Sequence, residues 1–232
     1  YNYATEGKQR RFIKTAFTQY LSPSVINQLL QNPENLKLGG ERRRISIFFS
    51  DIENFTSISE PLQPEQLTDL LNKYLSELSE IILKNGGTID KYEGDAIIAF
   101  WNAPLDTENH ERKAIETAIE CQKRLKELNS EFVKIAGRPL ATRIGINTGD
   151  AVVGNMGSSK RFDYTAFGDS VNLASRLEGL NKDFGTYILC TKETALYAKQ
   201  QGSPLKFRKI AYAKVLGKDK AVPVYSPTTK ED

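Results

Sequence analysis

Apolar residues recur at helical spacing in two long segments of the chain. After Pro64 they fall three or four positions apart, and Asn85-Gly86-Gly87 then provides a stop signal. Residues 109–135 repeat this spacing over a longer distance. Both segments are therefore predicted to be amphipathic helices that bury one side.

Short runs rich in β-branched and aromatic residues are the second feature of the pattern. The run 45–49 leads into Ser50-Asp51, whereas runs at 87–92 and 96–101 flank Glu93-Gly94-Asp95, which predicts a tight hairpin. The same signals predict further strands at 142–147, 151–155, 162–167, 186–190, 206–212 and 221–225, and helices over 171–180 and 192–201. Strands that alternate with long helices predict an α/β sandwich whose sheet is covered on one face.

Residues 1–38 differ from the rest of the chain and are predicted to form a helical arm. Basic residues precede apolar residues at helical spacing, and Ser22-Pro23 then begins a second short helix that Asn32-Pro33 ends. The arm is interpreted either as packing against its own domain or as a linker from an upstream sensory or membrane module. The chain begins at Tyr1 without a signal-peptide pattern, which is typical of a piece of a longer protein. Residues 39–232 are expected to be one folded domain.

Charge and cysteine content exclude several classes of function. The 32 basic and 29 acidic residues nearly cancel, so the net charge of +3 provides no broad positive field, and nucleic acid is not expected as a partner. Cys121 and Cys190 are too few for a disulfide framework or a zinc site, and no apolar run approaches the roughly 18 residues of a membrane span. We expect a cytoplasmic, reducing location for this domain, with a membrane anchor elsewhere in the full-length protein left open.

Two aspartates stand at the ends of predicted strands. Asp51 follows the buried strand 45–49, and Asp95 occupies the hairpin turn, so adjacent strands can bring the two together. Two carboxylates without a nearby His or Cys form a hard oxygen-donor site that suits Mg²⁺ or Mn²⁺ rather than zinc. The spacing alone also fits two turn-forming or capping residues. The single histidine, His110, is interpreted as a solvated residue at the start of a helix.

Four sequence motifs, which occur in order along the chain, favour the interpretation of Asp51 and Asp95 as a metal site over their interpretation as turn-forming or capping residues. They are residues 48–56 (FFSDIENFT), 91–95 (KYEGD), 143–149 (RIGINTG) and 163–176 (DYTAFGDSVNLASR). Together they make residues 40–228 resemble the class III adenylyl and guanylyl cyclase catalytic domain, in an adenylyl cyclase subclass of bacterial type. The resemblance implies an α+β fold with a ferredoxin-like βαββαβ core and additional C-terminal strands and helix. It also implies a head-to-tail homodimer with two active sites at the subunit interface.

The resemblance assigns the metal and phosphate contacts. It implies that Asp51, Asp95 and the Ile52 carbonyl oxygen bind two Mg²⁺ or Mn²⁺ ions. Such a site converts ATP to 3′,5′-cyclic AMP and pyrophosphate, by in-line attack of the ribose 3′-hydroxyl on the α-phosphate. Arg143 is implied to contact the triphosphate. A further phosphate-binding lysine is implied near the C-terminus, where Lys218 is the candidate and Lys220 is its rival.

Four further residues match positions that contact the substrate in the family. Asn172 and Arg176 are spaced i, i+4 on a predicted helix and so project from one face. The resemblance implies that the asparagine orients the ribose and that the arginine donates to the α-phosphate. Lys91 and Thr165 match the pair that selects the purine, and an ammonium with a hydroxyl oxygen suits N1 and the 6-amino group of adenine.

Every one of these family positions is present in a single chain, so a homodimer is expected to assemble two complete sites. One subunit is implied to supply Asp51, Asp95 and Arg143, and the other Lys91, Thr165, Asn172 and Arg176. ATP is the expected substrate, and bicarbonate is a hypothetical activating ligand. The alternatives are a guanylyl cyclase and a non-catalytic nucleotide-sensing dimerisation domain.

Overall fold

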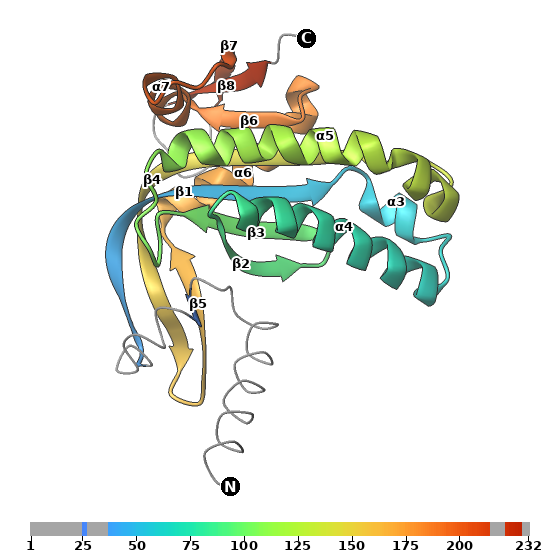
Figure 1. The fold of residues 1–232 in the computed structure, drawn as a ribbon, viewed down its shortest axis with the longest axis horizontal. Coiled ribbons are helices and arrows are strands. Elements are labelled where there is room, and N and C mark those ends of the chain that lie inside the picture. The colour runs from blue at the N-terminus through green and yellow to red at the C-terminus, as the bar shows by residue number, and fades with distance from the viewer. Residues whose placement is uncertain (1–24, 27–36, 214–220, 229–232) are drawn as a thin grey trace, which may run out of the picture.

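The computed structural model describes residues 25–26, 37–213 and 221–228, and their strands form an eight-stranded sheet (Figure 1). The strands are β1 (Gly39–Ile52), β2 (Thr88–Glu93), β3 (Ala96–Trp101), β4 (Thr142–Ser158), β5 (Arg161–Phe167), β6 (Ile188–Thr191), β7 (Lys206–Ala213) and β8 (Val222–Thr228). The helices with described bounds are α3 (Phe55–Ser59), α4 (Pro64–Lys84), α5 (His110–Ala136), α6 (Asp169–Phe184) and α7 (Lys192–Gln200). The sheet order is β2-β3-β1-β4-β6-β8-β7, and β5 pairs with β4 outside this path.

The ferredoxin-like core is confirmed. Its chain order is β1-α4-β2-β3-α5-β4, and antiparallel pairs join its strands in the order β2-β3-β1-β4. The helices α4 and α5 lie on one face of this sheet, where Phe48, Leu78 and Phe132 are among the buried side chains that pack together (Figure 1). The additional C-terminal elements continue the sheet, because β6 joins β4 in parallel and β8 and β7 follow. The two helices predicted from apolar spacing thus cover the core.

Helices cover both faces of the sheet, so the prediction of a sheet covered on one face is wrong. The helix α6 lies on the face opposite α4 and α5, where Ala174 packs with Ile45 and Val153 (Figure 1). This second face also carries apolar side chains at alternate strand positions, and α6 shields them from water. A Cβ atom on Gly145 would lie 2.2 Å from the Ala174 carbonyl oxygen, so the absent side chain lets α6 approach β4 closely.

The strand β4 is continuous, whereas the sequence predicted two strands at 142–147 and 151–155. Gly149 does not end the strand, because it pairs with Ile45 in the ladder with β1. The strand β1 correspondingly begins early, at Gly39. The long β1–β4 ribbon extends beyond the helices and carries β5 along its outer part (Figure 1).

Some expectations fall on residues outside the described ranges. They are most of the predicted helical arm, residues 1–38, and the two candidate phosphate-binding residues, Lys218 and Lys220. Within the arm, Val25 and Ile26 are described, and both are buried. Among the described helices, none combines the length and the apolar character that crossing a membrane requires.

The close contact between β4 and α6 leads to a stability prediction. Gly145→Ala is expected to lower the free energy of unfolding by about 1–3 kcal/mol, because the added methyl group meets main-chain atoms of α6. Gly179→Ala within α6 is the matched control: a Cβ atom there meets nothing within 4 Å, and alanine is the better helix former by roughly 0.5–1 kcal/mol. Urea denaturation followed by circular dichroism measures both variants. Equal destabilisation by the two substitutions would contradict the close contact.

Candidate active site

The C-terminal end of β1 meets the β2–β3 hairpin, and this contact brings two aspartates together. The strand β3 pairs antiparallel with β1, so the hairpin turn that carries Asp95 lies beside the end of β1. The Asp95 Oδ2 atom accepts a hydrogen bond from the Ile52 backbone N–H at 2.9 Å. The carboxyl groups of Asp51 and Asp95 lie close enough to interact. Glu178 on α6 lies close enough for its charge to act on Asp51, and we call Asp51, Asp95 and Glu178 the carboxylate cluster.

The carboxylate cluster concentrates negative charge in a partly buried position. Burial, the neighbouring Asp95 carboxyl group and the charge of Glu178 together raise the pKa of Asp51 to about 8. Burial also raises the pKa of Glu178. Ionising neighbouring carboxyl groups here costs free energy unless a positive charge compensates. The electrostatics therefore favour a bound cation.

The donor atoms of the cluster fit a hard divalent cation that takes further ligands from another source. Across the described ranges, no group of three or more His, Cys, Asp or Glu side chains is placed to hold a metal ion. Mg²⁺ typically takes one or two carboxylates and fills its other positions with water and substrate phosphate oxygens. Two aspartates and a backbone carbonyl oxygen match that requirement.

Arg143 lies directly beside the carboxylate cluster. It pairs in register with Asp51 across the β1–β4 ladder. Its guanidinium donates a hydrogen bond to Glu53 Oε1 at 3.3 Å, and its charge acts to lower the pKa of Glu178 against the effect of burial. The side chain is 13% exposed. Arg143 thus offsets part of the negative charge, and its contact with a triphosphate stays a prediction.

A second group of polar side chains lies where β5 reaches β2. The Lys91 Nζ atom donates a hydrogen bond to Thr165 Oγ1 at 3.2 Å, although the two residues are 74 positions apart. The Thr165 hydroxyl in turn donates to Asp90 Oδ2 at 2.7 Å. The structure thus brings Lys91 and Thr165 into contact; the sequence predicts that they select the base, and we call them the base-selecting pair. It also adds Asp90, which the sequence analysis missed.

Asn172 and Arg176, the α6 pair, stand on one face of α6. Leu173 and Leu177, which follow Asn172 and Arg176 in the sequence, are buried against β6 and β8, so the helix turns the face of the α6 pair away from the core. Asn172 is exposed and Arg176 is half-buried. Within the described part of the chain, neither side chain makes a hydrogen bond or an ion pair. Both are therefore available to a ligand.

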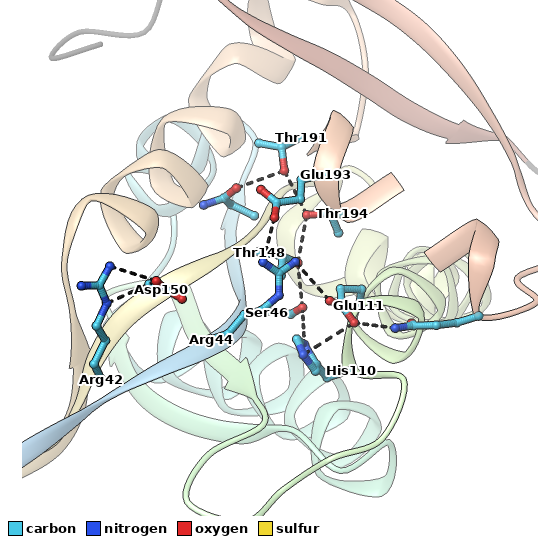
Figure 2. A network of polar contacts seen from close by, with 12 residues as sticks. Arg42, Arg44, Ser46, His110, Glu111, Thr148, Asp150, Thr191, Glu193 and Thr194 are labelled. Atoms are coloured by element: carbon cyan, nitrogen blue, oxygen red, sulfur yellow. Dashed lines mark hydrogen bonds and ion pairs between the residues drawn. The ribbon is translucent and has the colours of Figure 1, made fainter. Parts of the chain in front are cut away.

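A buried polar network surrounds the start of α5 (Figure 2). His110 Nδ1 lies 2.8 Å from Ser46 Oγ, and Arg44 forms ion pairs with Glu111 and Glu193. His110 is 8% exposed, and burial lowers its pKa. The interpretation of His110 as a solvated residue is therefore wrong, because the first turn of α5 packs against β1 and buries it.

The same network continues from Ser46 to Thr148, whose hydroxyl oxygens lie 2.8 Å apart, and on to Thr194 and Thr191 (Figure 2). Thr194 Oγ1 donates to Thr148 Oγ1 at 3.1 Å and lies 3.0 Å from Thr191 Oγ1. The Thr191 hydroxyl donates to Asn147 Oδ1 at 3.0 Å, and Asn147 Nδ2 donates to the Ser170 carbonyl oxygen at 2.9 Å. These groups find their partners inside the protein, so the network orders the start of α6 and does not resemble a substrate site. The anchoring role of Asn147 was not predicted from the sequence.

The single chain presents three sets of site residues, two of which include residues of α6. No hydrogen bond or ion pair among the described residues links the base-selecting pair to the carboxylate cluster or to the α6 pair. The carboxylate cluster lies at the end of β1, the base-selecting pair between β2 and β5, and the α6 pair on the helix that covers β4 and β6.

Comparison with known proteins identifies the family. The family model for the "Adenylate and Guanylate cyclase catalytic domain" matches residues 40–225. "Adenylate cyclase 1" of Rhizobium meliloti (strain 1021) is 40% identical over 210 residues, which cover 90% of this chain and 31% of that protein. The chain therefore spans less than a third of the length of this relative.

Solved structures of both adenylyl and guanylyl cyclases share the fold. The adenylyl cyclase CyaB from P. aeruginosa superposes with a TM-score of 0.76 at 38% identity, covering 83% of this chain and 97% of that one. The guanylyl cyclase Cya2 superposes with a TM-score of 0.72 at 34% identity, covering 82% and 94%. The resemblance found in the four motifs is thus confirmed, and the chain belongs to the adenylate and guanylate cyclase catalytic domain family.

Proposed function

We propose that this domain is an adenylyl cyclase, which converts ATP to 3′,5′-cyclic AMP and pyrophosphate. The observation that carries the choice of ATP is the 3.2 Å contact between Lys91 and Thr165. An ammonium donor beside a hydroxyl oxygen complements adenine, which offers N1 as an acceptor and its 6-amino group as a donor. Guanine instead offers N1–H and a 2-amino group, which need an acidic acceptor.

Asp90 does not supply that acidic acceptor. Its side chain is 2% exposed, and Oδ2 accepts hydrogen bonds from the Thr165 hydroxyl and the Ala166 backbone N–H. Its Oδ1 atom lies 3.4 Å from Lys91 Nζ. A carboxylate that is enclosed and engaged in this way does not reach the edge of a base. The pocket therefore favours ATP over GTP, although the solved guanylyl cyclase has a similar fold.

The carboxylate cluster supplies the metal site in this proposal. Asp51 and Asp95, with the Ile52 carbonyl oxygen, would hold two Mg²⁺ or Mn²⁺ ions. When bound, these ions lower the pKa of the ribose 3′-hydroxyl and stabilise negative charge on the phosphate oxygens. Arg143, held beside the cluster by Glu53, is proposed to contact the triphosphate. Lys218, outside the described residues, is proposed as a further phosphate contact.

The α6 pair is proposed to act on the reacting atoms. Asn172 would orient the ribose, and Arg176 would donate hydrogen bonds to the α-phosphate as negative charge builds there. Their i, i+4 spacing keeps both side chains over one ligand. Neither has to give up a protein partner among the described residues to do so.

A second copy of the chain is proposed to complete each site. The resemblance carried by the four sequence motifs supports this, with one subunit supplying Asp51, Asp95 and Arg143 and the other supplying the base-selecting and α6 pairs. Val152 and Phe167 add support, because they lie opposite each other on β4 and β5 and are 41% and 69% exposed. A second copy of the chain could cover these two side chains and remove them from water.

The domain is proposed to be one part of a longer protein. Residues 1–38 would form an arm from an upstream sensory or membrane module, in keeping with the greater length of the R. meliloti relative. Residues 39–232 would form the catalytic unit. Activation by bicarbonate is a separate hypothesis, and a bicarbonate titration that leaves the rate unchanged would remove it.

Product identification tests the proposed function. The purified chain is incubated with ATP and with GTP, each with Mg²⁺ and with Mn²⁺, and the products are resolved by liquid chromatography and mass spectrometry. We expect cyclic AMP and pyrophosphate in equal amounts, and a kcat/KM for ATP at least about 10-fold above that for GTP. A preference for GTP would support a guanylyl cyclase. No product from either nucleotide, at concentrations where the chain is dimeric, would support a non-catalytic domain.

A further inference from the structure

A bulge in β2 places two consecutive side chains on the same side of the sheet. The register with β3 shifts between Ile89 and Lys91, so Asp90 is the extra residue. In a regular strand, Asp90 and Lys91 would point to opposite faces. Bulges commonly re-aim a side chain next to an active site, and here both residues contact Thr165 on β5.

The Thr165 hydroxyl has one hydrogen to donate, and Asp90 receives it. Thr165 Oγ1 lies 2.7 Å from Asp90 Oδ2, which also accepts the Ala166 backbone N–H at 3.3 Å. Burial raises the pKa of Asp90, whereas the hydrogen bond from Thr165 and the Lys91 ammonium, 3.4 Å from Oδ1, act to lower it. Oδ2 accepts the Thr165 hydrogen whether or not Oδ1 carries a proton. The hydroxyl is therefore not free to donate elsewhere, and the Thr165 oxygen retains only acceptor capacity.

We propose that Asp90 is a positioning residue for base selection, which holds the Thr165 hydrogen so that the Thr165 oxygen accepts the 6-amino group of adenine. The inference rests on the proposed function, because it concerns the choice between ATP and GTP in the same pocket. Guanine carries its O6 carbonyl oxygen at the position of that amino group. Two acceptor oxygens that face each other form no hydrogen bond between them, so guanine would lose the contact that adenine makes with Thr165, which costs binding free energy.

Without Asp90, the same threonine would lose this preference. A hydroxyl that is free to rotate accepts from an amino group or donates to a carbonyl oxygen equally well. Thr165 alone therefore does not distinguish adenine from guanine, and the selectivity of the pair depends on a residue that does not touch the base.

A buried carboxylate beside an ammonium can also serve as a purely structural ion pair. Asp90 Oδ1 forms an ion pair with Lys91 at 3.4 Å, whereas Oδ2 accepts hydrogen bonds from Thr165 and Ala166, so the contacts fit either role. A structural role would lower stability and reduce activity equally with both nucleotides. A positioning role changes the ratio of activity with ATP to activity with GTP. Measuring this ratio therefore distinguishes the two roles.

Asp90→Ala and Asp90→Val remove the acceptor and leave Lys91 and Thr165 in place. We expect the ratio of kcat/KM for ATP to that for GTP to fall at least about 10-fold, with the KM for ATP rising more than its kcat falls. Thermal melting checks folding, and either variant that melts cooperatively serves for the comparison. A folded variant with the wild-type ratio, or with equal losses for both nucleotides, overturns the proposal.

Thr165→Val provides the matched background. In this background, Asp90→Ala is expected to change the ATP-to-GTP ratio less than about 3-fold, because the hydroxyl that Asp90 orients is gone. An effect of Asp90→Ala that persists at full size without the hydroxyl overturns the proposal.

Purine riboside 5′-triphosphate lacks only the 6-amino group of ATP, and it gives a test that needs no Asp90 variant. The wild type is expected to use it at least about 10-fold less efficiently than ATP, and Thr165→Val to use the two nucleotides about equally. Equal discrimination by both proteins overturns the acceptor role of Thr165. A wild type that forms cyclic GMP preferentially, or no cyclic nucleotide, contradicts the proposed function itself, so the two failures are distinguishable.

Discussion

Asp51→Asn and Asp95→Asn are each expected to lower kcat about 10³-fold or more, with the fold retained. Each substitution replaces a charged oxygen ligand with a neutral amide, and metal charge is the largest electrostatic contribution available at such a site. The two residues lie at the end of β1 and in a hairpin turn, so neither side chain fills the core. Initial rates of cyclic AMP formation with Mg²⁺ and with Mn²⁺ measure the loss. Asp69→Asn, at an exposed position of α4, is the control and is expected to retain wild-type activity.

A stability measurement without metal separates lost chemistry from lost folding. The pKa of Asp51 is about 8 in the folded protein and near 3.8 in the unfolded chain, so the folded state binds the proton more tightly. The free energy of unfolding therefore falls as pH rises from about 4 to 8. In EDTA at pH 8 to 9, Asp51→Asn is expected to be more stable than the wild type, with the difference shrinking toward pH 4. An inactive variant that is less stable than the wild type at pH 8 would contradict this account.

Mixing two inactive variants is expected to restore activity. Asp51→Asn damages the carboxylate cluster, and Arg176→Ala damages the α6 pair, so a heterodimer has one site with both defects and one with neither. With random pairing, about half of the dimers are heterodimers and each carries one intact site, which gives about one quarter of wild-type activity. The mixture is unfolded and refolded together, and cyclic AMP formation is compared with that of each variant alone.

The matched control combines two defects in the same set of residues. Asp51→Asn mixed with Asp95→Asn is expected to stay inactive, because every site in such a heterodimer then lacks one carboxylate. Rescue in this mixture would mean that the two aspartates act in different sites. That result would contradict the carboxylate cluster as a single metal site.

The fold was predictable where the sequence pattern is local. The apolar stripes of α4 and α5 and the hairpin around Asp95 depend on residues close in sequence, and the structure confirms them. Gly149-Asp150 has the composition of a turn, yet long-range pairing with β1 keeps β4 extended through it. The burial of the second face depends on Gly145, where the missing side chain matters only because α6 returns to that point.

The site was predictable where its residues lie in contiguous motifs. Asp51, Asp95, Lys91 and Thr165 are found in this way, and the structure brings each pair into contact. Asp90 was missed because strand alternation assigns it to the face opposite Lys91, and the bulge that reverses this arises from pairing with β3. The available signal was a carboxylate directly beside Lys91 within a predicted strand.

His110 shows a different limit of sequence analysis. Its neighbours in the sequence are polar and charged, which is typical of a solvated helix start. Its burial comes from Ser46, 64 positions away, on a strand that packs against the first turn of α5. A contact over such a separation leaves no trace in the local pattern.

A purified heterodimer tests the central claim most directly, namely that two copies of this chain share each ATP-cyclising site. Asp51→Asn and Arg176→Ala chains carry different affinity tags, and two successive purifications isolate dimers that contain one of each. Cyclic AMP formation per dimer is then measured with ATP and Mg²⁺ or Mn²⁺. The account predicts about half of the wild-type rate, because one of the two sites is intact. A heterodimer no more active than either variant alone would contradict it.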